Sequence, residues 1–342
     1  MSDRCSKCEL RSHRHYQISR PWYKEPIFII VTLILAAFLV HLGLSVRGIY
    51  ILAPLFAKFF NYLRLTWWAI LLGLLIGSLI EILIPEEFMA NLLGKGKKSI
   101  FIAVFLGFLA SACSHGILAI AISLYKKGAS TASTLAFLLA APWANLAITI
   151  LLFALFGMKA FFIISGAILI AIISGFIFQV LESKGLIEGS KAKSTGKKIK
   201  WFWPGWGKLS QGIGVNMWSL TKMVVWWILL GFFLASILGS FIPEMVFHRF
   251  FGPSVLGMLA TLALASIIEV CSEGSAPLAF ELFQKTGAFG NAFVFLQAGV
   301  ATDFTEIGIV LTNIGKRAAI ALVLVTVPLI LVLGFLFNHL LI

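Results

Sequence analysis

Charged residues are scarce in this chain of 342 residues. Asp, Glu, Lys and Arg together make up 12% of it, whereas a soluble domain contains roughly 25%. Hydrophobic residues reach 60%, and a soluble fold of this length could not bury so much apolar surface. The composition therefore excludes an ordinary soluble domain and predicts a protein that is solvated by the lipid bilayer.

Cysteines and enzymatic motifs are also few. Only Cys5, Cys8, Cys113 and Cys271 are present, which excludes a disulfide-rich secreted fold. The phosphate-loop pattern Gly-x4-Gly-Lys-Ser/Thr is absent, so we do not expect the chain itself to hydrolyse ATP. No Ser/His/Asp or His-Glu-x-x-His arrangement is evident. We therefore expect neither an enzyme nor a bound cofactor.

Acidic residues are outnumbered by basic ones, 14 against 27, which gives a formal net charge of +13. The basic residues cluster between apolar stretches, as they do at the ends of membrane spans that contact anionic lipid. No nucleic-acid recognition motif accompanies them. The expected partners are therefore the bilayer, its anionic lipids and a transported solute, with the oligomeric state left open.

The apolar stretches divide the chain into five segments. The first of them, 27–46, has no small-residue cleavage pattern after it and is interpreted as a retained span. We expect a multi-pass protein of the cytoplasmic membrane with its N-terminus in the cytoplasm. The predicted segments are a basic cytoplasmic tail (1–26), an N-terminal span with an interfacial segment (27–66), a transmembrane repeat (67–181), a basic cytoplasmic linker (182–216) and a second transmembrane repeat (217–342).

An internal duplication is indicated by residues that recur in the same order in both halves. Their offset is 158 residues and slips by one at short gaps. So many ordered matches predict two copies of one unit. The matched groups are Trp67-Trp68 with Trp226-Trp227, Pro85-Glu86 with Pro243-Glu244, Gly94 with Gly252, and Cys113-Ser114-His115-Gly116 with Cys271-Ser272-Glu273-Gly274.

The positions of the lysines favour inverted repeats. If 99–125 crossed the membrane fully, the lysines at 95–98 and 126–127 would lie on opposite sides, against the positive-inside rule. A re-entrant hairpin with Cys113–Gly116 at its tip would place both clusters in the cytoplasm. The predicted fold is thus an all-α polytopic membrane protein with two inverted repeats and one extra N-terminal span. Each repeat has three spans and a broken or re-entrant hairpin that carries Cys-Ser-x-Gly.

The paired tetrapeptides are the main candidate site. We expect a helical break at Gly116 and Gly274 and a pocket lined by the two motifs. Thiol and imidazole groups are ligands for thiophilic species, so Cys113, His115 and Cys271 are candidate metal ligands. The alternative is that each cysteine is a small buried hydrophobe. The predicted substrate-binding residues are Cys113, Ser114, His115, Gly116, Cys271, Ser272, Glu273 and Gly274.

Ionisable side chains inside spans are further candidates, because their burial is costly unless they are partnered. Glu269, Asp303 and Glu306 are predicted to carry coupling protons or to balance a cationic substrate, with Asn145 at the position that matches Asp303. Asp303 and Glu306 are three residues apart and are expected to share a helix face. Other carboxylates, including Glu81 and Glu281, are expected to be solvated at interfaces.

The N-terminal tail carries the pattern Cys5-x2-Cys8-x4-His13-x-His15. A Cys-x2-Cys pair begins many metal knuckles, although the full pattern fits no standard zinc spacing. The tail is interpreted either as a metal-handling segment or as a disordered basic segment that binds anionic lipid.

The tetrapeptides also carry a family resemblance. Cys113-Ser114-x-Gly116 followed by Lys126-Lys127-Gly128-Ala129-Ser130, with Glu269–Ser275 and Pro277-Leu278 in the second half, resembles a family of predicted bacterial and archaeal permeases. That family includes the trivalent organoarsenical efflux permeases of the ArsP type and proposed copper or zinc exporters. The resemblance covers about 67–340 and implies secondary transport, in the direction of efflux. Many relatives read Cys-Ser-Cys-Gly where this chain has His115, which shifts the expectation towards a transition metal or an uncharacterised solute.

Three functions follow from these patterns. The leading one is a proton-driven permease that exports a thiophilic metal, metalloid or organometalloid past the paired cysteines. The second is a membrane thiol–disulfide relay, which would need a low-pKa thiolate and a thioredoxin-like partner. The third is a permease for an uncharacterised organic solute, or a channel or lipid-handling protein.

Overall fold

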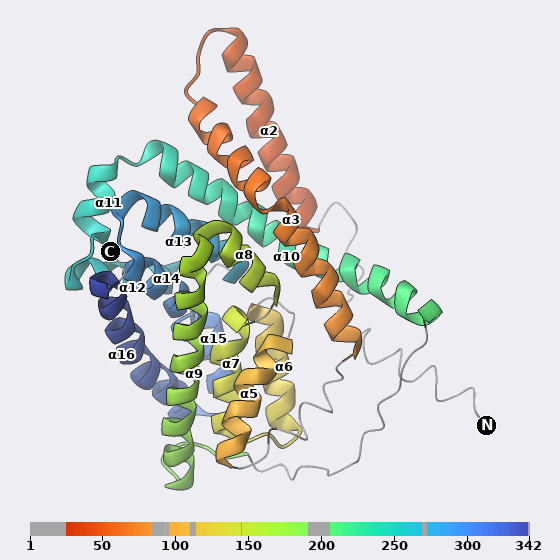
Figure 1. Cartoon of the computed structure of the whole chain (residues 1–342), viewed down its shortest axis with the longest axis vertical. Helices are drawn as coiled ribbons and strands as arrows, with labels where there is room; N and C mark the ends of the chain where they lie inside the picture. Colours follow the sequence, from red (N-terminus) through yellow and green to blue (C-terminus); the bar gives the residue numbers. More distant parts are fainter. Residues whose placement is uncertain are drawn as a thin grey trace. The chain divides into compact units, whose positions relative to one another are not determined.

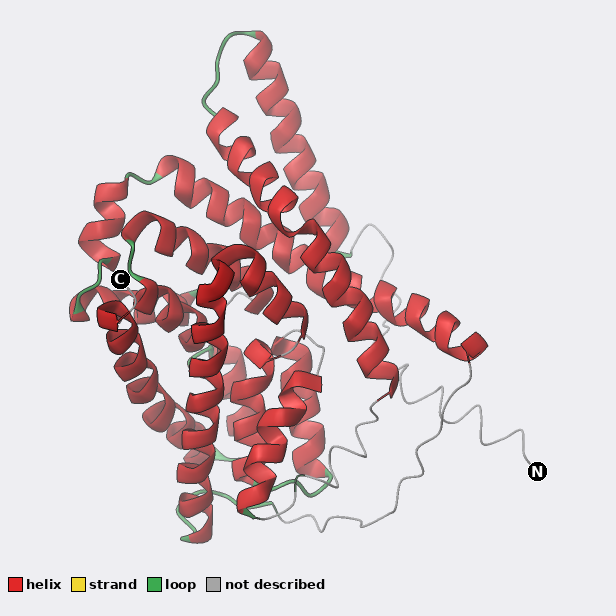
Figure 2. Cartoon of the chain, in the orientation of Figure 1, coloured by secondary structure: helices red, strands yellow, loops and turns green. Residues whose placement is uncertain are grey.

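The computed structural model describes residues 25–83, 93, 96–109, 114–144, 146–190, 206–268 and 272–340. Every regular element in these ranges is a helix, and no strand occurs in them (Figure 2). The chain divides into two compact units, 1–50 and 51–342.

The first unit contains one described helix, α2 (Pro26–Val46). A proline at its first position suits a helix start, because the missing N–H would have no partner there. Its 21 residues span roughly 30 Å, the thickness of the hydrocarbon core. It coincides with the span predicted over 27–46.

The second unit holds all the remaining described helices (Figure 1). They are α3 (Ala53–Leu83), α5 (Lys97–Leu109), α6 (Ser114–Lys126), α7 (Thr131–Ala144), α8 (Leu146–Phe156), the 3-10 turn η2 (Gly157–Lys159), α9 (Ala160–Ser183), α10 (Trp206–Phe241), α11 (Glu244–Phe251), α12 (Val255–Ile267), α13 (Ser272–Thr286), α14 (Phe289–Ala301), α15 (Phe304–Asn313) and α16 (Lys316–Leu340).

Six stretches of the described chain are long and apolar enough to cross a membrane. Helices α11 and α12 also pass this test as a pair, with a bend of 100° between them. The protein is therefore an all-helical polytopic membrane protein. The six stretches are Pro26–Val46, Ala53–Ile76, Ile148–Ser183, Gly212–Phe241, Phe289–Asn313 and Lys316–Leu340.

The predicted interfacial segment is not a separate element. Helix α3 runs without interruption from Ala53 to Leu83, so the predicted boundary between 66 and 67 falls inside it. Lys58, which lies in the predicted interfacial segment, pairs with Glu281 of α13.

Two long helix pairs run antiparallel. In α3 and α10, Ser78 Oγ donates to the carbonyl of Ile213, and Phe59 near the other end of α3 contacts Phe233. In α9 and α16, Phe162 near the start of α9 contacts Phe337 near the end of α16. At their opposite ends, Glu188 just after α9 accepts a hydrogen bond from Arg317 N in the first turn of α16.

Two glutamates, Glu182 in the last turn of α9 and Glu188 just after it, cap two other helices. The Glu188 carboxylate accepts hydrogen bonds from the backbone N–H groups of Arg317 and Ala318, in the first turn of α16. Glu182 accepts one from Ala132 N in the first turn of α7. Partial burial alone would raise the pKa of Glu188, but these N–H groups and the Arg317 guanidinium hold that pKa below its ordinary value of 4.5.

The helices α5 and α6 form a hairpin whose two ends lie together. Ser130 N, just after α6, donates to the carbonyl of Leu93, just before α5, at 3.1 Å. The hydroxyls of Ser99 in α5 and Ser133 in α7 are 2.8 Å apart. The chain therefore enters and leaves this segment at one end.

The helices α12 and α13 form a second hairpin of the same kind. Asn291 Nδ2, in the helix that follows α13, donates to the carbonyls of Phe251 and Gly252, which precede α12, at 2.8 and 2.9 Å. Asn338 of α16 holds this amide in place, because its Nδ2 donates to Asn291 Oδ1 and its Oδ1 accepts from Gly290 N. Asn291 is fully buried, so these bonds replace those it would make with water.

The core of the second unit is formed by α7 and α14, which contact each other. Residues 131–143 and 288–298 are buried without exception. Both helices are mainly apolar and are buried on all sides, as helices surrounded by other helices usually are, and polar residues such as Ser133 and Asn291 make hydrogen bonds there. Each follows one of the two hairpins and packs against both of its arms.

Candidate functional site

The second arm of each hairpin begins at the predicted motif. Helix α6 starts at Ser114 and α13 starts at Ser272, so Cys113 and Cys271 are the residues that immediately precede them in the sequence. The first arms are described to Leu109 and Ile267. In the second half α12 ends at Ile267, before the non-helical residue 268, while residues 110–113 and 269–271 lie outside the described residues.

The expected role of the motif glycines is wrong. Gly116 and Gly274 lie inside α6 and α13, two residues after each helix begins, and so do not form the breaks. Gly231 of α10 instead allows that helix to approach the backbone of Gly274 closely. A Cβ on Gly231 of α10 would come 2.8 Å from Gly274 Cα and 2.9 Å from its carbonyl carbon, well inside van der Waals contact.

Polar groups are buried at the start of α13. Ser272 and Glu273 are each 3% exposed, and the Ser272 hydroxyl donates to Glu273 Oε2 at 2.9 Å. Near the end of α12, the Ser266 and Thr302 hydroxyl oxygens are 2.7 Å apart. This bond places the end of the first arm beside the break between α14 and α15.

That break holds two of the predicted coupling carboxylates. Asp303 accepts a hydrogen bond from Thr305 N at 2.7 Å and so caps α15, and Glu306 is buried in the first turn. The prediction that they share a helix face is wrong, since Asp303 precedes the helix. Asp303-x-x-Glu306 is a capping-box pattern, which indicated a helix start that we overlooked within an apolar run.

The two halves exchange contacts around this region. Helix α15 packs against α6, the arm that begins at Ser114, and α13 packs against α8. Helix α8 follows α7 beyond residue 145, which lies outside the described residues, and α15 follows α14 after the break at residues 302 and 303. The second arm of each hairpin thus lies against the helix that follows the core helix of the other half.

Several predicted site residues lie outside the described residues. They are Cys5, Cys8, His13, His15, Cys113, Asn145, Glu269 and Cys271. For Ser114, His115 and Gly116 only the helical backbone is described. In the described ranges, no group of three or more His, Cys, Asp or Glu side chains could hold a metal ion. The thiol and imidazole ligand set therefore stays a prediction.

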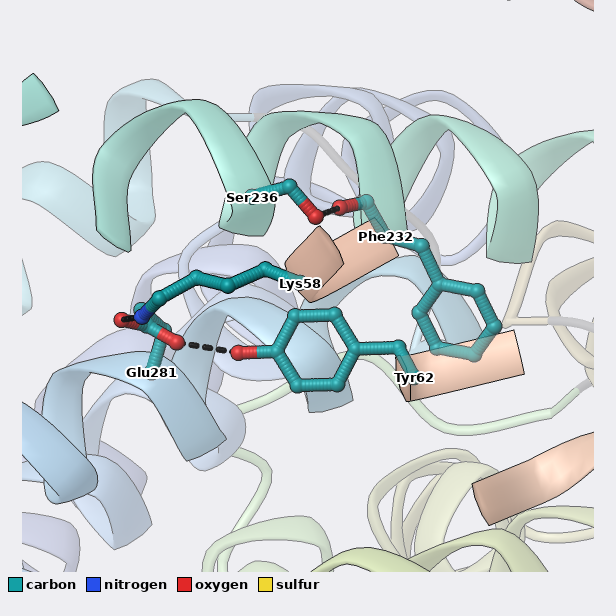
Figure 3. Close-up of polar contacts among 5 residues, drawn as sticks. All are labelled: Lys58, Tyr62, Phe232, Ser236 and Glu281. Carbon is teal, nitrogen blue, oxygen red and sulfur yellow. Dashed lines mark hydrogen bonds and ion pairs between the residues drawn. The ribbon is translucent and has the colours of Figure 1, made fainter. Parts of the chain in front are cut away.

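A buried ion pair lies on the other half of α13 (Figure 3). Lys58 Nζ is 2.5 Å from Glu281 Oε1, and the Tyr62 hydroxyl donates to Glu281 Oε2. Glu281 is 2% exposed, so the expectation that it is solvated at an interface is wrong. The pair ties α3, near its start, to the second arm of the hairpin.

Two aromatic rings pack on Tyr62, and a glycine lies beside Lys58 and Glu281. Phe232 of α10 stacks on the Tyr62 ring, and the Phe280 ring meets it edge-on. A Cβ on Gly239 of α10 would lie 2.5 Å from Lys58 Nζ. The glycine at this position therefore leaves the space that the ion pair occupies. In the sequence each charge stands in an apolar stretch, which indicates that each needs a partner but does not indicate which one.

The chemistry available to the described site is that of buried carboxylates beside helix starts. Glu273 is in the first turn of α13, and Asp303 and Glu306 are at the start of α15. The positive end of a helix dipole stabilises an anion at such positions. Groups of this kind can take up protons or balance a cation, and serine hydroxyls near them can orient a polar ligand.

Comparison with known proteins points to transport. The model of a family described as predicted permease, ArsP_1, matches residues 53–339. A Bacillus subtilis protein named "UPF0718 protein YcgR" is 25% identical over 278 residues, which cover 77% of this chain and 89% of that protein. No solved structure matches the chain.

Two further relatives carry permease titles. "Putative permease Rv2963" of Mycobacterium tuberculosis is 24% identical over 61% of this chain and 58% of its own length. The "Putative two-component membrane permease complex subunit" of Streptococcus mutans is 24% identical over 70% of this chain and 79% of its own length. Because the family model matches most of the sequence, including every described helix except α2 and the end of α16, the chain belongs to the ArsP_1 family of predicted permeases.

Proposed function

We propose that the protein is a secondary permease that exports a thiophilic metal, metalloid or organometalloid. The observation that supports the proposal is the placement of the two motifs in the sequence relative to the described helices. Cys113 and Cys271 each come one residue before the first described residue of a hairpin's second arm, Ser114 of α6 and Ser272 of α13. A helix start favours the thiolate form of a nearby cysteine, and the thiolate is the form that binds soft metals.

Inverted repeats are part of the proposal. Two helices of the first half start 158 residues before two of the second: Lys97 with Val255, and Thr131 with Phe289. A two-fold axis in the membrane plane makes equivalent helices antiparallel, whereas parallel repeats would leave them parallel. The antiparallel pairs α3 with α10 and α9 with α16 support inversion.

The hairpins would then enter from opposite faces and bring their tips towards the midplane. Lys98 and Lys126, at the base of the first hairpin, favour the cytoplasmic side for that base, and with it a cytoplasmic N-terminus. In this arrangement Cys113, His115 and Cys271 bind the substrate, with Ser114, Ser272 and Glu273 beside them. Glu269, Asp303 and Glu306, with Asn145 in the first half, supply compensating charge or polar contacts.

Transport into everted membrane vesicles tests the proposal directly. Vesicles with the wild-type protein should accumulate one of three probes, Zn²⁺, Cu⁺ or a trivalent organoarsenical, when a proton gradient is imposed. The double variant Cys113→Ser/Cys271→Ser should lose that accumulation, and the tail variant Cys5→Ser/Cys8→Ser serves as the matched control. The proposal fails if the membrane-cysteine variant transports as well as the wild type does. A reversible Cys113–Cys271 disulfide that equilibrates with thioredoxin would instead support a thiol relay.

A further inference from the structure

The ion pair between Lys58 and Glu281 is not used by the site at the hairpin tips. Both oxygens of the Glu281 carboxylate are engaged by α3, one by the Lys58 ammonium and the other by the Tyr62 hydroxyl (Figure 3). Ionisable groups inside a membrane protein are costly to keep, so they mark functional sites by default. We therefore expect the pair to have a function in addition to joining α3 and α13.

The two charged side chains differ in how much of their surface is exposed. The Lys58 side chain is 36% exposed, whereas that of Glu281 is 2% exposed. Lys58 is the sixth residue of α3, which places it roughly 7 Å from the start of that helix at 1.5 Å per residue. Lysine is a flexible side chain whose ammonium can move towards water. The lysine can thus leave the carboxylate, which cannot itself reach solvent.

We propose that Glu281 is a proton-binding site that couples transport to the proton gradient, with Lys58 as the counter-charge that the proton replaces. This inference rests on the proposed transport function. In one state the carboxylate is neutralised by the lysine. In the other, a proton from water adds to the carboxylate, the neutral acid no longer holds the ammonium, and Lys58 keeps its own proton and moves away. Loss of the bound proton restores the ion pair.

No other charged group among the described residues makes an ion pair or hydrogen bond with the Glu281 carboxylate. Helices α8 and α14 carry no ionisable side chain. The other ionisable groups on the helices packed against α13, and on α3 and α13 themselves, are Lys208 and Lys222 on α10, Glu244, His248 and Arg249 on α11, Arg64 and Glu81 on α3, and Glu273 and Lys285 on α13, with Lys159 over the Phe283 ring. In the described part of the chain, Lys58 and Tyr62 are the groups that contact the carboxylate.

Helix α13 connects this carboxylate to the proposed substrate site. Glu281 is nine residues from Ser272, which corresponds to about 13 Å along the helix. Release of Lys58 removes one of the two bonds that α3 makes to Glu281 at the base of the hairpin and leaves the bond from Tyr62, so a change there can move the motif at the other end of α13. Asp303 is less suited to the same role, because its carboxylate already caps α15.

Purified protein in proteoliposomes allows coupling to be separated from binding. With the probe that the wild type transports, Glu281→Gln should keep substrate exchange across the membrane but lose accumulation driven by a pH gradient, down to the level of empty liposomes. The exposed carboxylate Glu244 provides the matched control Glu244→Gln, which should keep both activities. Gradient-driven accumulation by Glu281→Gln at the wild-type rate would overturn the inference.

A second variant separates coupling from structural support. Lys58→Met/Glu281→Gln removes both charges, so neither is left buried alone and the fold is spared that cost. If the pair only stabilised the structure, this double variant would regain gradient-driven accumulation, and the inference would be wrong. If Glu281 carries the proton, the double variant should exchange substrate and still fail to accumulate it.

Infrared difference spectra between acidic and alkaline buffer test proton binding without any substrate. Acidification protonates other carboxylates as well, so the test is one component of the protonated-carboxyl band that appears in the wild type and in Glu244→Gln and is missing in Glu281→Gln. Absence of a band that depends on Glu281 would refute the inference, even if transport of a thiophilic substrate is confirmed. A band without any such transport would retain the proton site while refuting the proposed function.

Discussion

The contact between Gly231 of α10 and the backbone of Gly274 in α13 provides a test of how these two helices pack. Replacing Gly231 by alanine would put a methyl group 2.8 Å from Gly274 Cα and 2.9 Å from its carbonyl carbon. These are backbone atoms of α13, so no side chain can rotate away, and one helix must shift. Overpacking of this kind costs about 1–3 kcal/mol. Alanine also gains about 1 kcal/mol over glycine in a helix, which offsets part of that cost.

Gly214 provides the matched control on the same helix. Nothing lies within 4 Å of a Cβ added there, so Gly214→Ala should show only the helix-propensity gain, about 1 kcal/mol of stabilisation. Gly231→Ala should be less stable than Gly214→Ala by the overpacking cost, about 1–3 kcal/mol. The assay is denaturant unfolding in detergent micelles followed by tryptophan fluorescence. Equal free energies of unfolding in the two variants would refute the close contact of α10 with α13.

Three further substitutions probe other parts of the structure. Asn291→Leu leaves two buried carbonyls without their donor, so the free energy of unfolding in the same micelle assay should fall by about 1–3 kcal/mol, and unchanged stability would contradict the hairpin base described above. Asp303→Ala removes the cap of α15 and should cost about 1 kcal/mol; if vesicle transport survives at the wild-type rate, Asp303 is a capping residue and not a coupling one. The pKa of Glu188 is lowered in the folded protein, so its stabilisation is complete above its ordinary pKa of 4.5 and is lost as the pH falls below it. Melting temperatures of Glu188→Gln and wild type should therefore differ at neutral pH and converge in acid, and a constant difference would contradict this assignment.

Hydropathy and charge predicted the elements that are determined by their own stretch of sequence. Helices α2 and α16 coincide with uninterrupted apolar runs, because a span of about 20 apolar residues is recognisable without any partner. The positions of the lysines at 95–98 and 126–127 predicted that the segment between them begins and ends on one side. The bond from Ser130 to Leu93 brings those two ends together in the structure.

Features that depend on distant partners could not be predicted in this way. Lys58 and Glu281 are separated by 223 residues, and neither neighbourhood shows which charge lies opposite. Gly274 was interpreted from its own motif as a helix breaker, whereas its role depends on Gly231 of another helix. The break before α15 was predictable from its capping pattern, but the surrounding apolar run suggested one continuous span.

The amide of Asn338 has a consequence for the order in which the protein is assembled. It lies in α16, the last helix of the described chain, yet it positions Asn291 at the base of the second hairpin. During synthesis the hairpin arms α12 and α13 emerge well before this residue. The second hairpin therefore cannot be secured until α16 has been made and inserted, and its first turn then meets the carboxylate of Glu188, which was made 129 residues before Arg317. A ribosome stalled just before residue 338 should leave the first hairpin closed and the second one open to protease or thiol reagents.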